Sequence, residues 1–197
     1  MNQRSDDASA PTPLLSRPVR FVLILVVLAV IYLHLQGRVW WCQCGRWAPV
    51  SLHVNSQHNS QHLFDPYSLS HVLHGLLFFG ALWPLRHHLG LDLRRAIAAA
   101  IEIAWEMLEN SPIIIQRYRA ATISLGYTGD SIANSLADIT SFVLGFYVAR
   151  KVGLWYSVAI FLAAEALMLW LMRDNLTLNL LMLLWPIDAV RRWQGGG

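Results

Sequence analysis

The stretch "IEIAWEMLEN" (residues 101–110) places three acids in a chain that is otherwise composed like a membrane protein. Glu102, Glu106 and Glu109 are spaced by four and then by three residues, so their carboxylates share one face of a helix. A charged group inside a membrane span costs about 2.5–3.5 kcal/mol on insertion scales. We therefore predict that this helix is surrounded by protein rather than lipid, and that its acids face a polar cavity.

The composition around this stretch is that of a multi-pass membrane protein. Hydrophobic residues make up 55% of the chain and charged residues only 14%, with a mean hydropathy of +0.41, whereas soluble domains carry about 25% charged residues. Several of the nine tryptophans stand at segment ends, as an interfacial belt requires. The formal charge of +3 is mild, and no basic–aromatic surface for nucleic acid is present in the pattern. Membrane lipids are the expected partners.

We predict an all-α fold, a polytopic transmembrane helical bundle of about six segments. The segments are 19–35, 67–83, 95–110, 130–149, 153–172 and 176–187. No small-x-small cleavage site follows the first one, so it is read as an uncleaved span. The last is shorter than the roughly 20 residues that cross a bilayer, and a buried or partial span is its alternative. Residues 1–17 are predicted to be a disordered cytoplasmic tail, 18–194 a single transmembrane domain, and 195–197 a flexible C-terminal tail.

The distribution of arginine predicts the orientation. With the N-terminus in the cytoplasm, the inner loops hold more basic residues than the outer ones, which favours both termini inside. The localisation expected is therefore the bacterial inner membrane. The stretches "CQCG" (42–45) and "NSQHNSQHLFD" (55–65) then lie outside.

Four histidines on that outer side are candidate metal ligands. His71 and His74, in "SHVLHG" (70–75), are three residues apart on one helical face, and the repeated "NSQH" places His58 and His62 four apart. Imidazoles combined with carboxylates form the ligand set of zinc or another divalent metal. The tight HExxH form is absent from the sequence, and buried histidines with satisfied hydrogen bonds are the alternative interpretation.

Further polar residues near the same membrane face are candidates for catalysis and substrate binding. A bound metal could activate water for hydrolysis, and without metal the cluster could relay protons. The candidate catalytic residues are Glu106, Glu109, Asp130 and Asn134, and the candidate substrate-binding residues are Arg117, Arg119 and Asn110. The arginines suit an anionic head group.

Each of these groups has a structural alternative. Asp130 is equally suited to capping the fourth span, and Asp65 before Pro66 to capping the second. The glutamates could pair with the arginines as an interhelical latch. Cys42 and Cys44, in "WCQCGRW" (41–47), would form a strained disulfide. A metal-binding pair, a free dithiol and two small residues in a turn are open readings for them.

Several long motifs resemble a known family. "GRWAP", "NSQH", "DPYSLSHVLHG", "EIAWEMLENSPIIIQRYR", "GYTGDSIANSLAD" and "RDNLTLN" together resemble a family of uncharacterised bacterial multi-pass inner-membrane proteins, a domain of unknown function, over residues 37–194. The resemblance implies a helical inner-membrane protein and brings no activity. A weaker similarity to VanZ-like proteins rests on their order of an acid, an Arg and Asp-x-x-x-Asn, matched by Glu109, Arg117 or Arg119, Asp130 and Asn134; the four histidines depart from it.

Two functional hypotheses follow. The first is a metal-dependent hydrolase or transferase acting on a lipid-linked or envelope substrate, in which His71 and His74 hold a metal with Glu109 or Asp130, and Glu106 is the acid or base. The second is a non-enzymatic protein, either a proton- or ion-coupled carrier or a metal-handling or membrane assembly factor. The patterns leave open whether the protein is an enzyme, and they specify no oligomeric state.

Overall fold

The computed structural model describes residues 16–52, 54, 56–122 and 126–195, and these residues form helices and loops without a named β-strand. The helices are α1 (Arg17–Leu35), α2 (Ser68–Ala81), the 3-10 helix η1 (Trp83–His87), α3 (Leu91–Glu109), α4 (Pro112–Ala121), α5 (Ile132–Val152), α6 (Leu154–Met172), α7 (Leu176–Leu184) and α8 (Asp188–Gln194). The all-α prediction is confirmed, and each of the six predicted segments contains a helix. The predicted N-terminal tail lies outside the described residues except for its last two.

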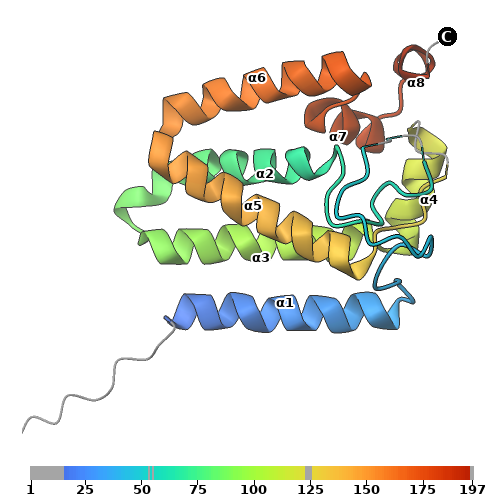
Figure 1. The fold of residues 1–197 in the computed structure, drawn as a ribbon. Coiled ribbons are helices and arrows are strands. Elements are labelled where there is room, and N and C mark those ends of the chain that lie inside the picture. The colour runs from blue at the N-terminus through green and yellow to red at the C-terminus, as the bar shows by residue number, and fades with distance from the viewer. Residues whose placement is uncertain (1–15, 53, 55, 123–125, 196–197) are drawn as a thin grey trace, which may run out of the picture.

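Five helices run lengthwise beside one another (Figure 1). From top to bottom in that view, the order is α6, α2, α5, α3 and α1. Helix α2 contacts α5 and α6, and α1 contacts α3. We call one end of the bundle the site end: it holds the loops 36–67 and 126–131 with α4, α7 and α8. The far end holds the start of α1, η1 and the turn between α5 and α6.

Three of the helices, α1, α5 and α6, are long and apolar enough to cross a membrane, and α2 is a shorter apolar helix. These helices support membrane association. They differ in how much protein covers them. Of the most apolar window in each helix, 61% is buried inside the protein for α5, against 11% for α1 and 17% for α6. The central helix α5 therefore carries polar residues inward, while α1 and α6 present apolar surface outward.

Two glycines let α2 and α5 approach backbone to backbone. A Cβ atom at Gly75 would overlap the carbonyl oxygen of Phe142, and one at Gly145 would overlap that of Val72. Small residues are the usual means by which membrane helices pack this closely. One turn before Gly75 on α2 lies His71, which this packing brings toward α5.

Aromatic side chains fill the bundle from His74 toward the far end. Phe78 packs against His74 and Phe142, with ring centroids 6.4 and 6.1 Å apart, and Phe79 packs against Phe146 at 5.5 Å. The buried core around them is Leu73, Leu76, Phe79, Ala98, Ala99, Phe142, Phe146, Ala149 and Met168. This half of the bundle is mainly apolar, with Arg94 and Ser157 among its buried polar residues.

The predicted topology of six crossings with both termini on one side is not confirmed. Helix α7 has nine residues, a length of about 13.5 Å, which is less than half of a bilayer core. Its continuation turns back, because Nε2 of Gln194 donates to Oδ1 of Asp174, just before α7, at 3.1 Å. The described chain thus starts at the far end and finishes at the site end (Figure 1).

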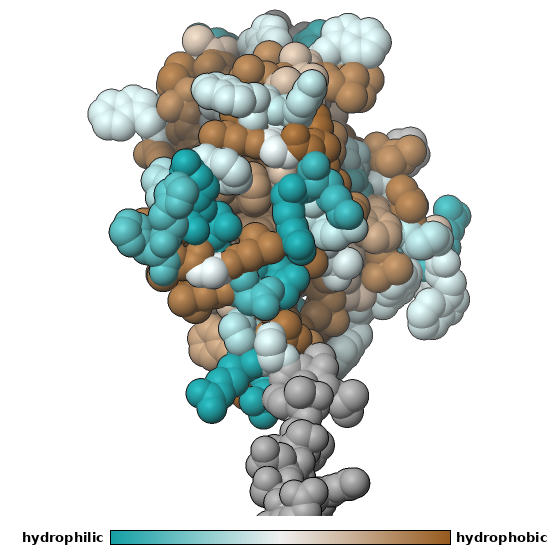
Figure 2. Space-filling model, turned by 90° about the vertical axis from the view of Figure 1, so that its left-hand side faces the viewer, coloured by the Kyte–Doolittle hydropathy of each residue, from teal (hydrophilic) through white to brown (hydrophobic). Residues whose placement is uncertain are grey.

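This course of the chain removes the charge asymmetry behind the predicted orientation. Figure 2 looks onto the far end, where hydrophilic side chains lie among hydrophobic ones. Among the described residues, the far end carries Arg17, Arg20, Arg86, Arg94, Arg95, Arg150 and Lys151, and the site end carries Arg38, Arg46, Arg117, Arg119, Arg173, Arg191 and Arg192. The two sets are equal in number because Arg191 and Arg192 lie at the end opposite to the one predicted.

Candidate metal centre

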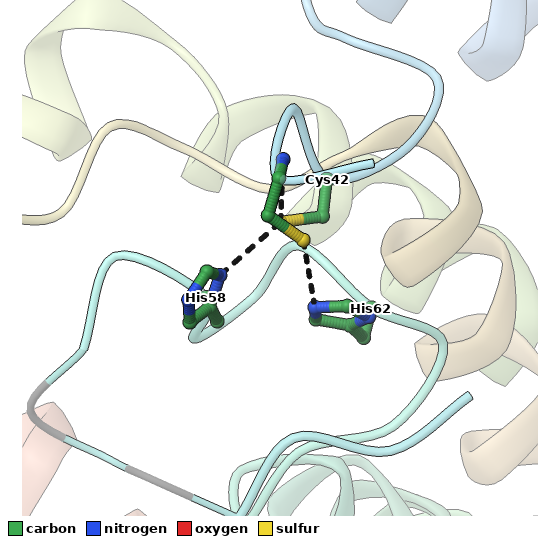
Figure 3. A group of neighbouring side chains, drawn as sticks. Cys42, His58 and His62 are labelled. Carbon is green, nitrogen blue, oxygen red and sulfur yellow. Dashed lines mark hydrogen bonds between the residues drawn. The ribbon is translucent and has the colours of Figure 1, made fainter. Parts of the chain in front are cut away.

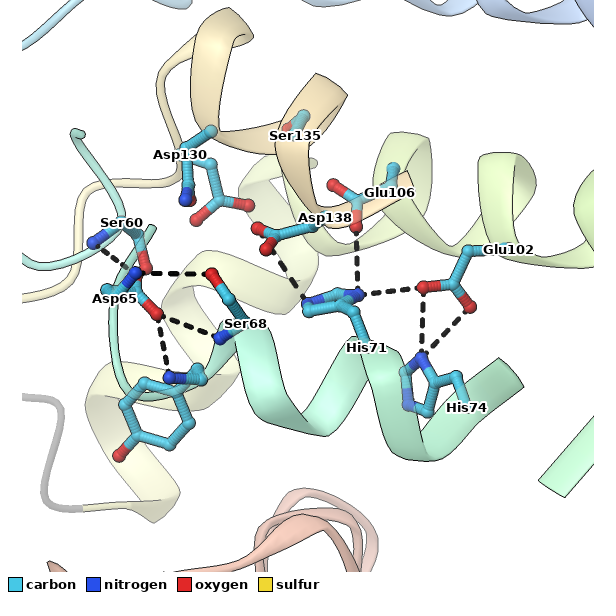
Figure 4. Close-up of polar contacts among 12 residues, drawn as sticks. Ser60, Asp65, Ser68, His71, His74, Glu102, Glu106, Asp130, Ser135 and Asp138 are labelled. Atoms are coloured by element: carbon cyan, nitrogen blue, oxygen red, sulfur yellow. Dashed lines mark hydrogen bonds and ion pairs between the residues drawn. The ribbon is translucent and has the colours of Figure 1, made fainter. Parts of the chain in front are cut away.

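A cluster of histidines and acids lies where α2, α3 and α5 meet, in the half of the bundle nearer the site end (Figure 4). His71 and His74 come from α2, Glu102 and Glu106 from α3, and Asp138 from α5. The spacings of three and four residues place each pair on one helical face. All are buried except His74, which is half-buried.

Glu102 holds both imidazoles of α2. Nδ1 of His71 lies 2.7 Å from Oε1 of Glu102, and Nδ1 of His74 lies 3.0 and 2.9 Å from the two carboxylate oxygens. An ionised carboxylate only accepts hydrogen bonds, so Nδ1 of each ring carries a proton, and Nε2 is the nitrogen that can bind a metal when the ring is neutral. Carboxylates orient metal-binding histidines in this way. Glu102 is fully buried, so water does not compete for its oxygens.

Glu106 and Asp138 both face the imidazole ring of His71, but some of their carboxylate oxygens accept no hydrogen bond among the described residues. Oε1 of Glu106 lies 3.3 Å from Nδ1 of His71, and Oδ2 of Asp138 lies 3.9 Å from Nε2. Among the described residues, neither oxygen of Glu106 and not Oδ1 of Asp138 has a hydrogen-bond partner. Buried carboxylates are costly unless a cation or a proton compensates them. A bound cation would therefore compensate the charge of these buried carboxylates.

Two overlapping triplets have the spacing of metal ligands. One is His71, His74 and Glu102, and the other is His71, Glu106 and Asp138; in each, one ligand atom per residue lies within 4.8 Å of the others. His71 belongs to both. The second triplet also contains the unsatisfied oxygens, whereas Glu102 in the first already accepts from two imidazoles. The second triplet is therefore the better place for an ion.

A cavity of about 70 Å³ adjoins the cluster. His71, His74 and Asp138 line it together with Glu109 and Asp130, so the structure brings the predicted groups to one cavity. Its remaining walls are mainly polar and aromatic side chains, namely Asn59, Ser60, Asp65, Tyr67, Ser70, Trp105, Tyr118, Tyr127, Leu176 and Asn179. Such a cavity can hold water and a small polar group beside the acids.

Asp130 is held rigidly in the cavity wall by Asn110. Nδ2 of Asn110 donates to Oδ2 of Asp130 at 2.9 Å, and the backbone N–H of Asp130 donates to Oδ1 of Asn110 at 2.6 Å. The hydroxyl of Tyr127 donates to Oδ1 at 2.8 Å. Burial raises the pKa of Asp130 against these hydrogen bonds. Asp130 does not cap α5, because Oγ of Ser131 accepts the amide of Asn134.

Three other predicted residues bind the backbone. Arg117 donates through Nε to the carbonyl of Leu183 at 2.7 Å, and Arg119 through Nε to that of Tyr127 at 2.6 Å. No ion pair joins either arginine to Glu106 or Glu109 among the described residues, so the predicted latch is not present there. Asn134 donates through Nδ2 to the carbonyl of Leu63 at 3.2 Å.

The sequence also predicted roles for Asp65, His58 and His62. Asp65 accepts the amides of Tyr67 and Ser68 just before α2, but the N-cap position of the helix is Tyr67 rather than the predicted Asp65. His58 and His62 do not join His71 and His74; they face the two cysteines in the loops. Sequence reasoning left Glu102 and Asp138 out of the ligand set. Glu102 could have been found from its four-residue spacing to Glu106, and Asp138 from its eight-residue spacing to Asp130.

Comparisons with known proteins agree on one family. Residues 33–196 match the family model described as "Protein of unknown function (DUF2585)". A "UPF0314 protein" of Paracoccus denitrificans is 49% identical over 179 residues, covering 91% of this chain and 93% of the relative. Proteins with the same designation from Agrobacterium fabrum and Sphingopyxis alaskensis are 48% and 44% identical, covering 86% and 88% of this chain and 86% and 92% of the relative. No solved structure matches.

Proposed function

Since this chain belongs to the DUF2585 family, as its motifs predicted, its function has to be argued from its site, and we propose that it is a membrane-embedded, divalent-metal-dependent hydrolase. The observation that carries the proposal is the pair of buried carboxylates beside His71, of which both oxygens of Glu106 and Oδ1 of Asp138 accept no hydrogen bond among the described residues. The VanZ-like similarity stays a prediction.

A divalent cation suits this cluster by charge and by ligand type. Three carboxylates and the imidazole of His71 are buried together beside the half-buried His74, and a doubly charged ion would compensate the excess negative charge. We assign Nε2 of His71 with oxygens of Asp138 and Glu106 as ligands, and Glu102 as the group that orients His71 and His74. Imidazole and carboxylate ligands suit zinc or manganese.

The cavity supports hydrolysis as the use of such an ion. A metal in a partly open site lowers the pKa of bound water toward 7 and supplies a nucleophile at neutral pH. Glu109 and Asp130 line the same cavity, and either carboxylate could accept a proton from that water.

The distribution of polar groups favours a hydrolase over a carrier. The cluster itself ends at His74, and Phe78, Phe142 and Phe146 pack beyond it. A proton- or ion-coupled carrier needs access from both membrane faces, whereas this cluster adjoins a polar cavity toward the site end and packs against Phe78 in the other direction. A site that serves one membrane face is what an enzyme on envelope or lipid-linked substrates would use.

We further propose how the protein sits in the bacterial inner membrane. Helices α1, α2, α3, α5 and α6 would cross it, with the far end in the cytoplasm and the site end outside. The equal numbers of basic residues at the two ends do not select this orientation, so reporter fusions have to test it. The mouth of the cavity would then lie near the head groups. Arg117 and Arg119 lie at this end, and among the described residues only part of their donors bind backbone carbonyls, which suits an anionic lipid-linked substrate.

The test begins with metal content. Full-length protein carrying Cys42→Ser and Cys44→Ser is purified in detergent and loaded with Zn²⁺ or Mn²⁺, so that only the buried cluster is assayed. About one ion per chain is expected, and it should be lost in Glu106→Gln with Asp138→Asn but kept in the surface control His87→Ala. Absence of bound metal contradicts the proposal.

Activity is tested with p-nitrophenyl phosphate and p-nitrophenyl acetate, and then with phosphatidylglycerol vesicles. Hydrolysis that needs the metal and is abolished by Glu106→Gln supports the proposal. Metal flux across reconstituted vesicles without any hydrolysis would instead identify a carrier.

A further inference from the structure

A second group of metal-binding side chains lies outside the helices, between two loops at the site end (Figure 3). Cys42 and Cys44 lie in the loop after α1, and His58 and His62 lie in the loop before α2. Sγ of Cys42 is 3.4 Å from Nδ1 of His58, and Sγ of Cys44 is 3.8 Å from Nε2 of His62. Both cysteines are free thiols.

The four ligand atoms have the spacing of a tetrahedral site. All of them lie within 4.8 Å of one another. Zinc bonds of about 2.3 Å to sulfur and about 2.0–2.1 Å to nitrogen give a tetrahedron whose edges are roughly 3.3–3.8 Å long. The two sulfur–nitrogen distances given above, 3.4 and 3.8 Å, are edges of that size. Small side-chain rotations would complete the geometry.

His62 is oriented for metal binding by its surroundings. Its Nδ1 lies 2.6 Å from the carbonyl oxygen of Ala48, which can only accept, so Nδ1 carries the proton and Nε2 presents its lone pair to Cys44. The ring also packs edge-on against Trp41 at 5.7 Å, and Trp41 stacks on Trp47 at 5.4 Å. The ring is therefore held in place before any ion binds.

We propose that Cys42, Cys44, His58 and His62 form a second metal site, which binds Zn²⁺ through two thiolates and two imidazoles. Thiolates and imidazoles are the ligands of structural zinc. A disulfide between Cys42 and Cys44 is the less suitable use of these thiols, because one intervening residue strains the bond. This site is independent of the buried cluster and of the proposed hydrolase.

The position of the site indicates what the zinc does. The two loops contain little regular structure, with one isolated β-bridge between Val50 and Phe64 in the part described. They nevertheless position the start of α5, since Ser131 donates to the carbonyl of Ser60 at 2.9 Å and Ile132 to that of Val39 at 2.8 Å. A zinc ion joining the loops would hold the backbone beside Asp130, as structural zinc does where no apolar core is available.

An entry path for the ion is present. A polar cavity of about 500 Å³ adjoins the site and is lined by Cys42, Cys44 and His58, with Asp130 on its wall. Cys44 is exposed, so the site can be loaded from solvent.

The test uses Co²⁺ in the full-length protein in detergent, because cobalt bound by thiolates shows a charge-transfer band that oxygen and nitrogen ligands alone do not give. The wild type should show the band, and Zn²⁺ should displace it. Cys42→Ser with Cys44→Ser should abolish the band and one equivalent of bound zinc. Glu106→Gln with Asp138→Asn should keep it, which separates this site from the buried one.

Two histidine variants distinguish the loss of a metal ligand from misfolding of the protein. His62→Ala should lose the band, whereas His58→Cys should keep it, because the new thiolate can replace the imidazole. His87→Ala with His88→Ala, both exposed at the far end, is the control and should behave as wild type. Cobalt binding without a thiolate band, or an oxidised Cys42–Cys44 pair in protein purified with zinc under reducing conditions, would overturn the proposal.

Discussion

Nδ1 of His71 on α2 lies 2.7 Å from Oε1 of Glu102 on α3, although 31 positions separate the two residues in sequence. The contact is buried, and the same carboxylate also accepts from His74. One acid thus determines the orientation of both imidazoles that face the cavity. The first prediction concerns this acid.

Glu102→Gln should weaken metal binding at the buried cluster by about 10–100-fold, the usual cost of losing an orienting partner of a metal ligand. A neutral amide accepts hydrogen bonds more weakly than a carboxylate, and its NH2 group cannot accept from Nδ1 of His74 as Oε2 of Glu102 does. Affinity is measured by competition with a metal dye, in protein that also carries Cys42→Ser and Cys44→Ser. Asp92→Asn, an exposed acid on the same helix, is the control. Equal affinity in the two variants would contradict the role given to Glu102.

Glu106→Gln should stabilise the metal-free protein and remove its stabilisation by metal. The buried carboxylate has no hydrogen-bond partner among the described residues, and an amide of the same shape is cheaper to bury. At 100 times the Kd, a ligand adds about 2.7 kcal/mol to stability, and this gain should vanish in the variant. Thermal unfolding in detergent with and without Mn²⁺ measures both effects. A variant that loses stability without metal, or still gains it with metal, would show that Glu106 plays another part.

Gly75→Ala and Gly145→Ala should each destabilise the protein, by about 1–3 kcal/mol or more. The added methyl would overlap a backbone carbonyl, which cannot move aside as a side chain can. Gly80→Ala, on the same helix as Gly75, is the matched control. Its Cβ would meet only the side chain of Leu154 at 3.5 Å, and alanine favours the helix by up to ~1 kcal/mol. Unfolding midpoints that fall equally at all three positions would contradict the close α2–α5 packing.

A reporter inserted after Gln57 and one fused after Gln194 should lie on the same side of the membrane, and one after His88 on the other side. This follows from the return of Gln194 to Asp174 at the site end. The orientation proposed above makes the first two periplasmic. Alkaline phosphatase and green fluorescent protein fusions give the readout. Gln57 and Gln194 on opposite sides would restore the six-crossing arrangement.

Cys44 should react with iodoacetamide faster than Cys42 in metal-free protein. Cys44 is exposed, and the hydrogen bond from the Cys42 thiol lowers the pKa of Cys44. Burial raises the pKa of Cys42. Because the thiolate forms above the pKa, Cys44 alkylation should persist to lower pH than that of Cys42. Mass spectrometry of the two products measures the rates, and Zn²⁺ should protect both. Faster labelling of Cys42 would reverse this assignment.

Parts of the site could be predicted because helical periodicity is local. The faces of His71 and His74, and of Glu102 and Glu106, follow from spacings of three and four residues within one helix. The position of Asp65 before Pro66 predicts a cap, and its carboxylate does accept two amides at the start of α2, although the N-cap position itself is Tyr67. Helical spacing does not predict which residues meet across helices. Asp138 and Glu102 are 36 positions apart, and both lie beside His71 on a third helix.

By itself the sequence determined that this protein is an all-α, apolar chain with acids and histidines on particular helical faces, because hydropathy and helical spacing depend on neighbouring residues alone. Only the tertiary structure decided that Gly75 meets α5, that the four histidines separate into two pairs with different partners, and that the chain after α7 returns to the site end. These features depend on which helices are neighbours and how closely their backbones approach. Such contacts join residues far apart in the chain, and no local pattern encodes them.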